Sequence, residues 1–140
     1  MIAKAQQVFA DTAFWIALAV KQDQHHDRAE RWAAKLFGTM TTTAAIILET
    51  ANALARPAWR LHGVALLDHV QQRSNIEVIA FSADLWKRGW DMYKNRMDKA
   101  WSLTDCISFL VMQERGLTDA LTADEHFRQA GFRALLLEEP

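Results

Sequence analysis

Three acidic residues stand alone inside apolar segments of the chain. Asp11, Glu49 and Asp105 are each the only charged residue in a stretch of more than ten residues. An ionised carboxylate is costly to bury unless it is paired with a cation or bound to a metal, and no basic residue lies nearby in sequence. Carboxylate oxygens are the ligands that hard divalent cations prefer. The pattern therefore points to a cation site made of acidic side chains.

Short apolar runs alternate with helical patterns along the whole sequence, which indicates an α/β fold with a central parallel sheet covered by helices. We expect one domain over residues 1–140, with about four to five strands. The strands are expected at residues 8–10, 39–43, 76–80, 120–122 and 133–136. The helices are expected at residues 13–20, 23–37 (ended by Gly38), 44–56, 64–73, 82–97 (capped by Ser82), 104–116 (starting at Thr104) and 125–130.

This arrangement would bring four acidic residues to one edge of the sheet. Asp11 directly follows the first strand, and Asp124 follows residues 120–122. Glu49 and Asp105 lie in the first turns of their helices, and ligands of parallel sheets bind beyond the carboxyl ends of the strands. Each residue also has a purely structural interpretation, because carboxylates commonly cap helices or interact with helix N-termini.

The residues around these acids resemble the PIN domain family, most closely the VapC-type ribonuclease toxins of toxin–antitoxin pairs. The resemblance covers nearly the whole chain. The matching segments are Asp11-Thr12, ETANAL from Glu49, WSLTDCISF from Trp101, LTADEHF from Leu121, and Gly131-Phe132.

The resemblance implies a Mg²⁺- or Mn²⁺-dependent endoribonuclease that acts on RNA, forms a homodimer and is neutralised by a cognate antitoxin. It also implies that the whole chain is a single PIN-like nuclease domain. The alternative is a catalytically silent PIN-like module that binds RNA or protein. The intact acidic positions favour the enzyme.

We expect Asp11, Glu49, Asp105 and Asp124 to hold one or two metal ions, so that water attacks the phosphorus in line. The set contains no histidine or cysteine, which argues against zinc. Three further residues are candidates for a supporting role. Thr12 and Thr104 would orient a carboxylate or a water, or serve only as helix-start hydroxyls. Asp98 would be an outer ligand, or a solvated loop residue.

Residues 87–99 carry an excess of three positive charges just before the SLTD segment. Lys94, Arg96 and Lys99 are candidates for contacts with RNA phosphates, and Arg56 belongs to a second, weaker basic patch. Tryptophans and a tyrosine are interleaved with these cations. Their helical spacing is more typical of the core or a dimer interface than of base stacking, and we expect core packing for most of them.

Composition is that of an ordinary globular domain. The 140 residues are 51% hydrophobic, and 16 basic against 17 acidic residues give a formal net charge of -1. The single cysteine excludes a disulfide framework, and no targeting or membrane-spanning segment is evident, so we expect a cytoplasmic protein. If four carboxylates are metal ligands, the remaining charge is -1 + 4 = +3, which is compatible with an RNA substrate.

Overall fold

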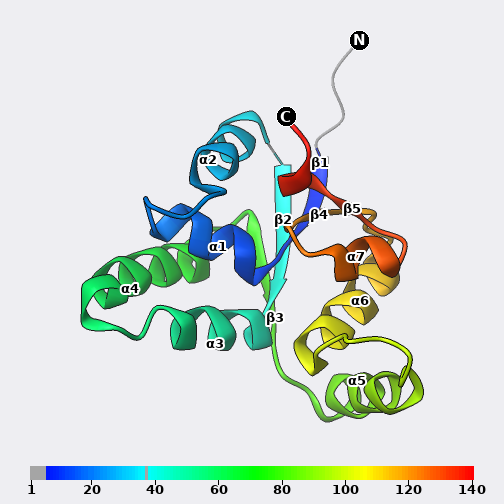
Figure 1. Ribbon diagram of the computed structural model, residues 1–140. Helices are drawn as coiled ribbons and strands as arrows, with labels where there is room; N and C mark the ends of the chain where they lie inside the picture. Colours follow the sequence, from blue (N-terminus) through cyan, green and yellow to red (C-terminus); the bar gives the residue numbers. More distant parts are fainter. Residues whose placement is uncertain (1–5, 37) are drawn as a thin grey trace.

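Five parallel strands form the centre of the computed structural model, which describes residues 6–36 and 38–140 (Figure 1). The strands are β1 (Gln6–Ala10), β2 (Gly38–Thr43), β3 (Ile76–Ile79), β4 (Asp119–Leu121) and β5 (Arg133–Ala134). The α-helices are α1 (Thr12–Ala19), α2 (His26–Lys35), α3 (Ala44–Ala53), α4 (Pro57–Gln72), α5 (Ala83–Asn95), α6 (Leu103–Arg115) and α7 (Glu125–Gln129).

The sheet has the order β3-β2-β1-β4-β5, and every neighbouring pair is parallel. Strand β1 lies in the middle, where Phe9 is in register with Thr41 of β2 and with Ala120 of β4. The predicted α/β class with a parallel sheet is therefore confirmed. Because all strands run the same way, their carboxyl ends meet at one edge.

Helices cover both faces of the sheet (Figure 1). The helices α1, α2, α3 and α4 pack together on one side, and α5, α6 and α7 on the other. Phe9 from β1 is fully buried between these layers, as are Phe109 of α6 and Phe127 of α7, whose rings meet edge to face at 4.9 Å between centroids. This aromatic packing fixes α6 and α7 against the sheet.

Helix α4 begins at Pro57 and is longer than the predicted helix at residues 64–73. Proline suits the first helical position, because its missing N–H has no partner there in any case. The preceding helix, α3, ends at Ala53 instead of the predicted Arg56. Pro57 thus separates the two helices, as its position in the sequence indicates, and also starts the second one.

Two other boundaries differ from the prediction. Gly38 does not end a helix: it begins β2 with a backbone φ of 118°, a left-handed value that favours glycine. Helix α2 covers His26–Lys35 only, and its predicted last residue, Phe37, lies outside the described residues. The last strand has two residues and continues as a 3₁₀ turn at Leu135–Leu137, where a longer strand was predicted.

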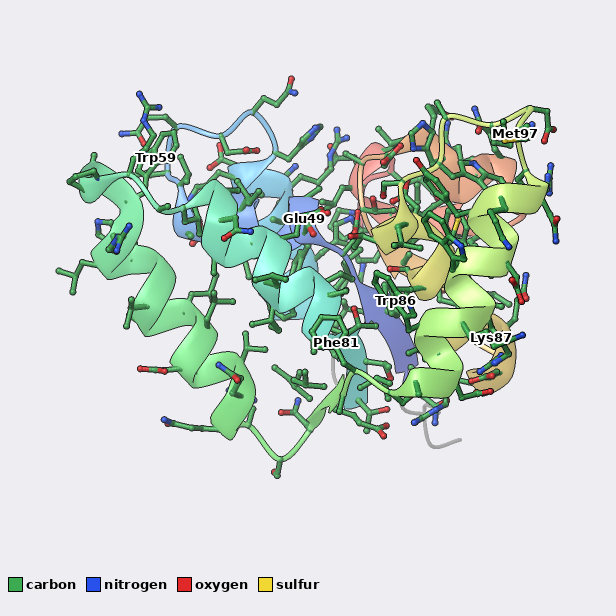
Figure 2. The ribbon with its side chains drawn as sticks, turned by 90° about the horizontal axis from the view of Figure 1, so that it is seen from below. Glu49, Trp59, Phe81, Trp86, Lys87 and Met97 are labelled. Atoms are coloured by element: carbon green, nitrogen blue, oxygen red, sulfur yellow. The ribbon has the colours of Figure 1, made fainter. Side chains whose placement is uncertain are left out.

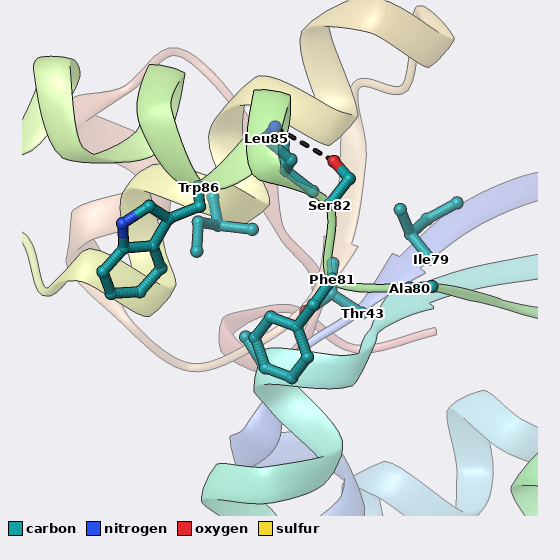
Figure 3. A pocket seen from close by; sticks show the side chains of 9 residues that line it. Thr43, Ile79, Ala80, Phe81, Ser82, Leu85 and Trp86 are labelled. Carbon is teal, nitrogen blue, oxygen red and sulfur yellow. Dashed lines mark hydrogen bonds between the residues drawn. The ribbon is translucent and has the colours of Figure 1, made fainter.

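Ser82 caps α5 as predicted, and its hydroxyl accepts a hydrogen bond of 3.0 Å from the Leu85 N–H (Figure 3). The side chains of Phe81 and Trp86 flank this cap, and both are more than half exposed. Among the described residues, no helix has both the length and the apolar character required to span a membrane.

Gly89 permits the close packing of α5 on α6. A Cβ atom at this position would lie 2.8 Å from Cγ1 of Ile107, so that contact would have to open. Although alanine favours a helix by about 1 kcal/mol over glycine, overpacking costs about 1–3 kcal/mol. We expect Gly89→Ala to lower the free energy of unfolding by about 1 kcal/mol, measured by urea denaturation. In an Ile107→Ala background, Gly89→Ala should instead raise the free energy of unfolding. A lower free energy of unfolding in both backgrounds would contradict this account.

Candidate active site

Asp11 and Asp124 follow neighbouring strands at the carboxyl edge of the sheet. The backbone N–H of Asp11 donates to the carbonyl of Leu121 at 3.2 Å, which extends the pairing of β1 with β4 by one step. Asp124 comes three residues after Leu121 and caps α7. The predicted convergence of these two residues therefore follows from strand register.

Thr122 links the two loops and is fully buried. Its hydroxyl donates to Oδ2 of Asp11 at 2.8 Å and accepts from the backbone N–H of Asp124 at 3.1 Å. Asp11 was a candidate helix cap, but its side chain forms no capping hydrogen bond to α1. Sequence reasoning did not single out Thr122; the only available signal was its place in the LTAD segment.

Asp105 enters the same region from the first turn of α6. It forms a capping box with Ser102, in which its N–H donates to the Ser102 hydroxyl at 3.0 Å and its Oδ2 accepts from the Ser102 N–H at 3.1 Å. Ser102, and not Thr104, is thus the cap of this helix. The helix-start interpretation of Asp105 is correct, and the capping box also fixes the direction of its carboxylate.

His126 lies between Asp105 and Asp124. Its Nδ1 is 2.9 Å from Oδ2 of Asp105 and 3.3 Å from Oδ1 of Asp124, and its backbone N–H donates to the same Asp124 oxygen at 2.9 Å. The expectation that the cluster contains no histidine is therefore wrong. The strand–turn–helix geometry after β4 folds residue 126 back onto residue 124, which sequence spacing alone did not reveal.

Glu49 differs from the other acids because it is exposed. It lies in the second turn of α3, between this helix and the layer of α5, α6 and α7 (Figure 2). The predicted burial of its carboxylate is not observed. It is nevertheless close enough to contribute electrostatic repulsion at Asp11.

The burial of these carboxylates changes their proton affinity. Burial raises the pKa of Asp11 to about 7, against the hydrogen bonds from Thr122 and from the Thr12 backbone, and Asp105 and Glu49 raise it further by repulsion. Burial also raises the pKa of Asp105, while the Ser102 backbone and His126 act in the opposite direction. Without a cation, the surroundings therefore shift the proton equilibrium of both acids toward the neutral form.

The arrangement fits a divalent cation. Asp105, Asp124 and His126 each offer a ligand atom, and these atoms all lie within 4.8 Å of one another. Next to Asp11, the buried hydroxyl of Thr12 has no hydrogen-bond partner among the described residues. Clustered carboxylates, raised pKa values and an unsatisfied oxygen are all features that a bound cation would relieve.

The other predicted supporting residues lie outside this cluster or at its border. Thr104 is half-buried beside Asp105 in the first turn of α6. Asp98 is exposed and pairs with Arg96, whose Nε donates to it at 3.1 Å. The solvated-loop interpretation of Asp98 is therefore the one that its surroundings support.

The predicted RNA contacts fall into two separate places. Lys94, Arg96 and Lys99 lie at the end of α5 and in the loop that follows, whereas Arg56 precedes α4 and stacks over the ring of Trp59 at 4.8 Å. Figure 2 shows Trp59 and Met97, which mark these two regions, on opposite sides of the molecule.

The aromatic residues of α5 are not core residues. Trp86, Trp90 and Tyr93 are exposed, so the expectation that most of these aromatics pack in the core is wrong for α5. Trp101 is the exception, because it is buried and packs edge to face on Phe109. Helical spacing showed that the α5 rings share a face, but it did not show which way that face points.

Comparison with known proteins gives a consistent result. Residues 8–133 match the model of the PIN domain. The chain is 32% identical over 126 residues to the 23S rRNA-specific endonuclease VapC20 of Mycobacterium tuberculosis, a match that covers 89% of this chain and 95% of that protein.

Solved structures agree with this match. The crystal structure of Mycobacterium tuberculosis VapC20, a sarcin–ricin loop cleaving toxin, superposes with a TM-score of 0.83 and 29% identity, over 89% of this chain and 95% of that one. VapBC2 from Rickettsia felis, bound to a promoter DNA fragment, gives 0.63 at 13% identity over 92% and 97%. FitAcB from Neisseria gonorrhoeae gives 0.60 at 16% identity over 91% and 94%. At these lower identities the likeness shows the fold alone.

The raised pKa of Asp11 predicts that pH affects stability. Between pH 4 and pH 7 the folded protein holds a proton at Asp11 that the unfolded chain, with a pKa of 3.8, has released. The free energy of unfolding of the metal-free protein should therefore fall as pH rises through this range, by up to about 1.4 kcal/mol per pH unit for one proton. Denaturant titrations in chelator at pH 5, 6 and 7 measure it. In Asp11→Asn the slope should flatten, and an unchanged slope would contradict the assignment.

Proposed function

The chain belongs to the PIN domain family, and on that premise we propose that its carboxylate cluster is the active site of a divalent-metal-dependent endoribonuclease, the toxin of a toxin–antitoxin pair. One observation carries the proposal. Asp11, Asp105 and Asp124 come from three separate segments and converge at the carboxyl edge of the sheet, where Thr122 and His126 hold them in place. A domain that only bound other molecules would gain nothing from burying mutually repelling acids.

The relative VapC20 suggests the substrate class. It is named as a 23S rRNA-specific endonuclease and as a sarcin–ricin loop cleaving toxin, and it aligns with 89% of this chain. We propose that this protein also cleaves a structured ribosomal RNA. The sarcin–ricin loop of 23S rRNA is therefore the first substrate to test.

The proposed ligands of Mg²⁺ or Mn²⁺ are Asp11, Asp105 and Asp124, with Glu49 contributing from the exposed side. When bound, such an ion supplies positive charge to the phosphodiester, lowers the pKa of water and stabilises the leaving oxygen. Thr12 and Thr104 are proposed to orient the carboxylates or water from neighbouring positions, while Asp98 has no role in this scheme because it pairs with Arg96.

The side chains of the protein prepare the site for the cation. The Thr122 hydroxyl donates to Oδ2 of Asp11 and orients this carboxylate, and the Ser102 N–H orients Asp105 in the same way. Nδ1 of His126 lies 2.9 Å from Oδ2 of Asp105 and 3.3 Å from Oδ1 of Asp124, so this ring links the two carboxylates. With a pKa of about 7, Asp11 is partly protonated at neutral pH, and binding of a cation would require its ionised form.

Two partners follow from the toxin proposal. A cognate antitoxin would neutralise the enzyme, and the protein itself would act in the cytoplasm as a homodimer. Growth arrest on expression that a neighbouring gene product relieves would support the antitoxin, and light scattering of the purified protein measures the oligomeric state.

The activity is tested with purified protein and a labelled RNA oligonucleotide containing the sarcin–ricin loop. We expect cleavage with Mg²⁺ or Mn²⁺ and none in EDTA. Removal of one carboxylate in Asp11→Asn or Asp105→Asn should reduce the cleavage rate at least about 100-fold, because supporting residues alone are worth about 10- to 100-fold. Asp68→Asn, at an exposed position on α4, is the matched control and should leave the rate unchanged.

RNA binding without cleavage in the presence of either metal would contradict the nuclease proposal, because it would indicate a silent binding module. Cleavage that persists in both variants and in chelator would place the chemistry elsewhere. If the protein cleaves other RNAs but not the sarcin–ricin oligonucleotide, the ribosomal target is rejected and the proposed nuclease activity is retained.

His126 provides a separate prediction. We expect His126→Ala to weaken Mn²⁺ binding about 10- to 100-fold, because Asp105 and Asp124 then lose the side chain that links them. Isothermal titration calorimetry measures the affinity. His62→Ala on the exposed side of α4 is the control. Normal Mn²⁺ affinity together with lost cleavage would show that His126 acts on the RNA and not on the cation site.

A further inference from the structure

Two aromatic rings of α5 stack on each other at the surface. The ring centroids of Trp90 and Tyr93 are 5.6 Å apart with an interplanar angle of 16°, and each residue is 43% exposed. Met97, in the loop one turn further on, is 88% exposed. Two large rings that stack on each other at the surface form a flat apolar platform. Such a platform usually marks an interaction site.

The platform forms one wall of an open groove of about 670 Å³, which we call the aromatic groove. It is lined by Trp90, Tyr93, Arg96, Met97, Lys99 and Trp101, and it ends at Ser102 and Leu103. Ser102 caps α6 and binds the carboxylate of Asp105. This end of the groove therefore lies next to Ser102, the residue that orients one of the proposed metal ligands.

Leu103 connects this groove to the other acids. It also lines an adjacent groove of about 290 Å³ that includes Glu49, Thr104 and Trp86. The two grooves thus meet at the start of α6. An extended chain lying along them would pass from the stacked rings to Glu49, the exposed acid of the proposed site.

Cations accompany the rings. Arg96 stacks over the ring of Trp101 at 4.7 Å while it pairs with Asp98, and Lys94 lies 3.7 Å from Asp91. Lys99 forms no ion pair with any residue in the part of the chain that the structure describes. The groove therefore joins flat apolar surfaces to an excess of positive charge, a combination that matches the bases and phosphates of a single-stranded nucleic acid.

We propose that the aromatic groove binds unpaired nucleotides of the RNA substrate next to the cleavage site. One base stacks on the Trp90–Tyr93 pair, and Lys99 and Arg96 contact phosphates. The proposal rests on the proposed ribonuclease function for the identity of the ligand. A second copy of the chain is the less favoured occupant, because the cations and the link to Asp105 would have no purpose in a subunit interface.

Binding is measured apart from cleavage. In an Asp11→Asn background, which should not cleave, the affinity for a fluorescently labelled single-stranded RNA of about eight nucleotides is read by anisotropy. We expect Trp90→Ala and Tyr93→Ala each to weaken binding about tenfold, in line with the stacking of one base. Trp90→Phe and Tyr93→Phe keep a flat ring and should retain most of the affinity.

Two changes separate stacking from charge. An RNA of the same length with abasic positions has no base to stack on the rings. Its affinity for the Trp90→Ala variant should therefore equal its affinity for the protein with both rings intact, and both should be weak. Lys99→Ala should instead lower the salt dependence of binding by about one charge. Leu61→Ala, at an apolar position 76% exposed on α4, is the matched control and should bind like the parent.

The outcomes distinguish the possible failures. Unchanged affinity in both aromatic variants, or equal losses with base-containing and abasic RNA, would overturn the stacking proposal. A change from dimer to monomer in these variants, measured by light scattering, would show that the face contacts a second copy and would also overturn it. If the wild type binds RNA through these rings but never cleaves it, the proposed RNA binding in the aromatic groove is supported and the nuclease proposal is rejected.

Discussion

Asp11 carries a carboxylate into a region from which water is almost excluded, and Asp105 and Asp124 approach it there. Repulsion between the carboxylates and their burial both disfavour the ionised forms, and the raised pKa values of Asp11 and Asp105 follow from this. The parallel sheet makes the arrangement unavoidable, because the register of β1 with β4 places residues 11 and 122 side by side. The rest of the site is organised around this constraint: Thr122 binds Oδ2 of Asp11, and Ser102 and His126 both contact Oδ2 of Asp105.

The same helix connects the buried acids to the molecular surface. The first turn of α6 presents Asp105 inwards, while Ser102 and Leu103 border the aromatic groove outside. A net charge of -1 therefore averages two regions of opposite character, an acidic site and a basic, aromatic border. Such a division suits a polyanionic substrate, since the border attracts phosphates and the acids hold the cation that acts on one of them.

Much of the site could be predicted from local signals. Asp11 and Asp124 follow strands, Asp105 lies in the first turn of α6 and Glu49 in the second turn of α3, so chain order and the parallel sheet were enough to bring them to one edge. His126 and Thr122 were missed because their roles depend on the turn between β4 and α7, which brings each of them to Asp124 two positions away. They also depend on contacts with Asp105 and Asp11, which are distant in sequence. The burial of Glu49 was predicted wrongly because an apolar segment was taken to surround its side chain, whereas α3 turns this position outwards.

The sequence by itself determined the class of fold, the order of strands and helices along the chain and the four acidic positions, because these depend on periodicity, composition and neighbours in the chain. Tertiary structure decided which strands pair, where Pro57 starts a helix, and which face of α5 meets the core. A helical repeat shows that Trp90 and Tyr93 share a face, but only the packing of α6 against the opposite face, at Gly89, directs their rings to the solvent. The physical reason is that burial and proton affinity depend on neighbours distant in sequence, and these neighbours exist only once the chain has folded.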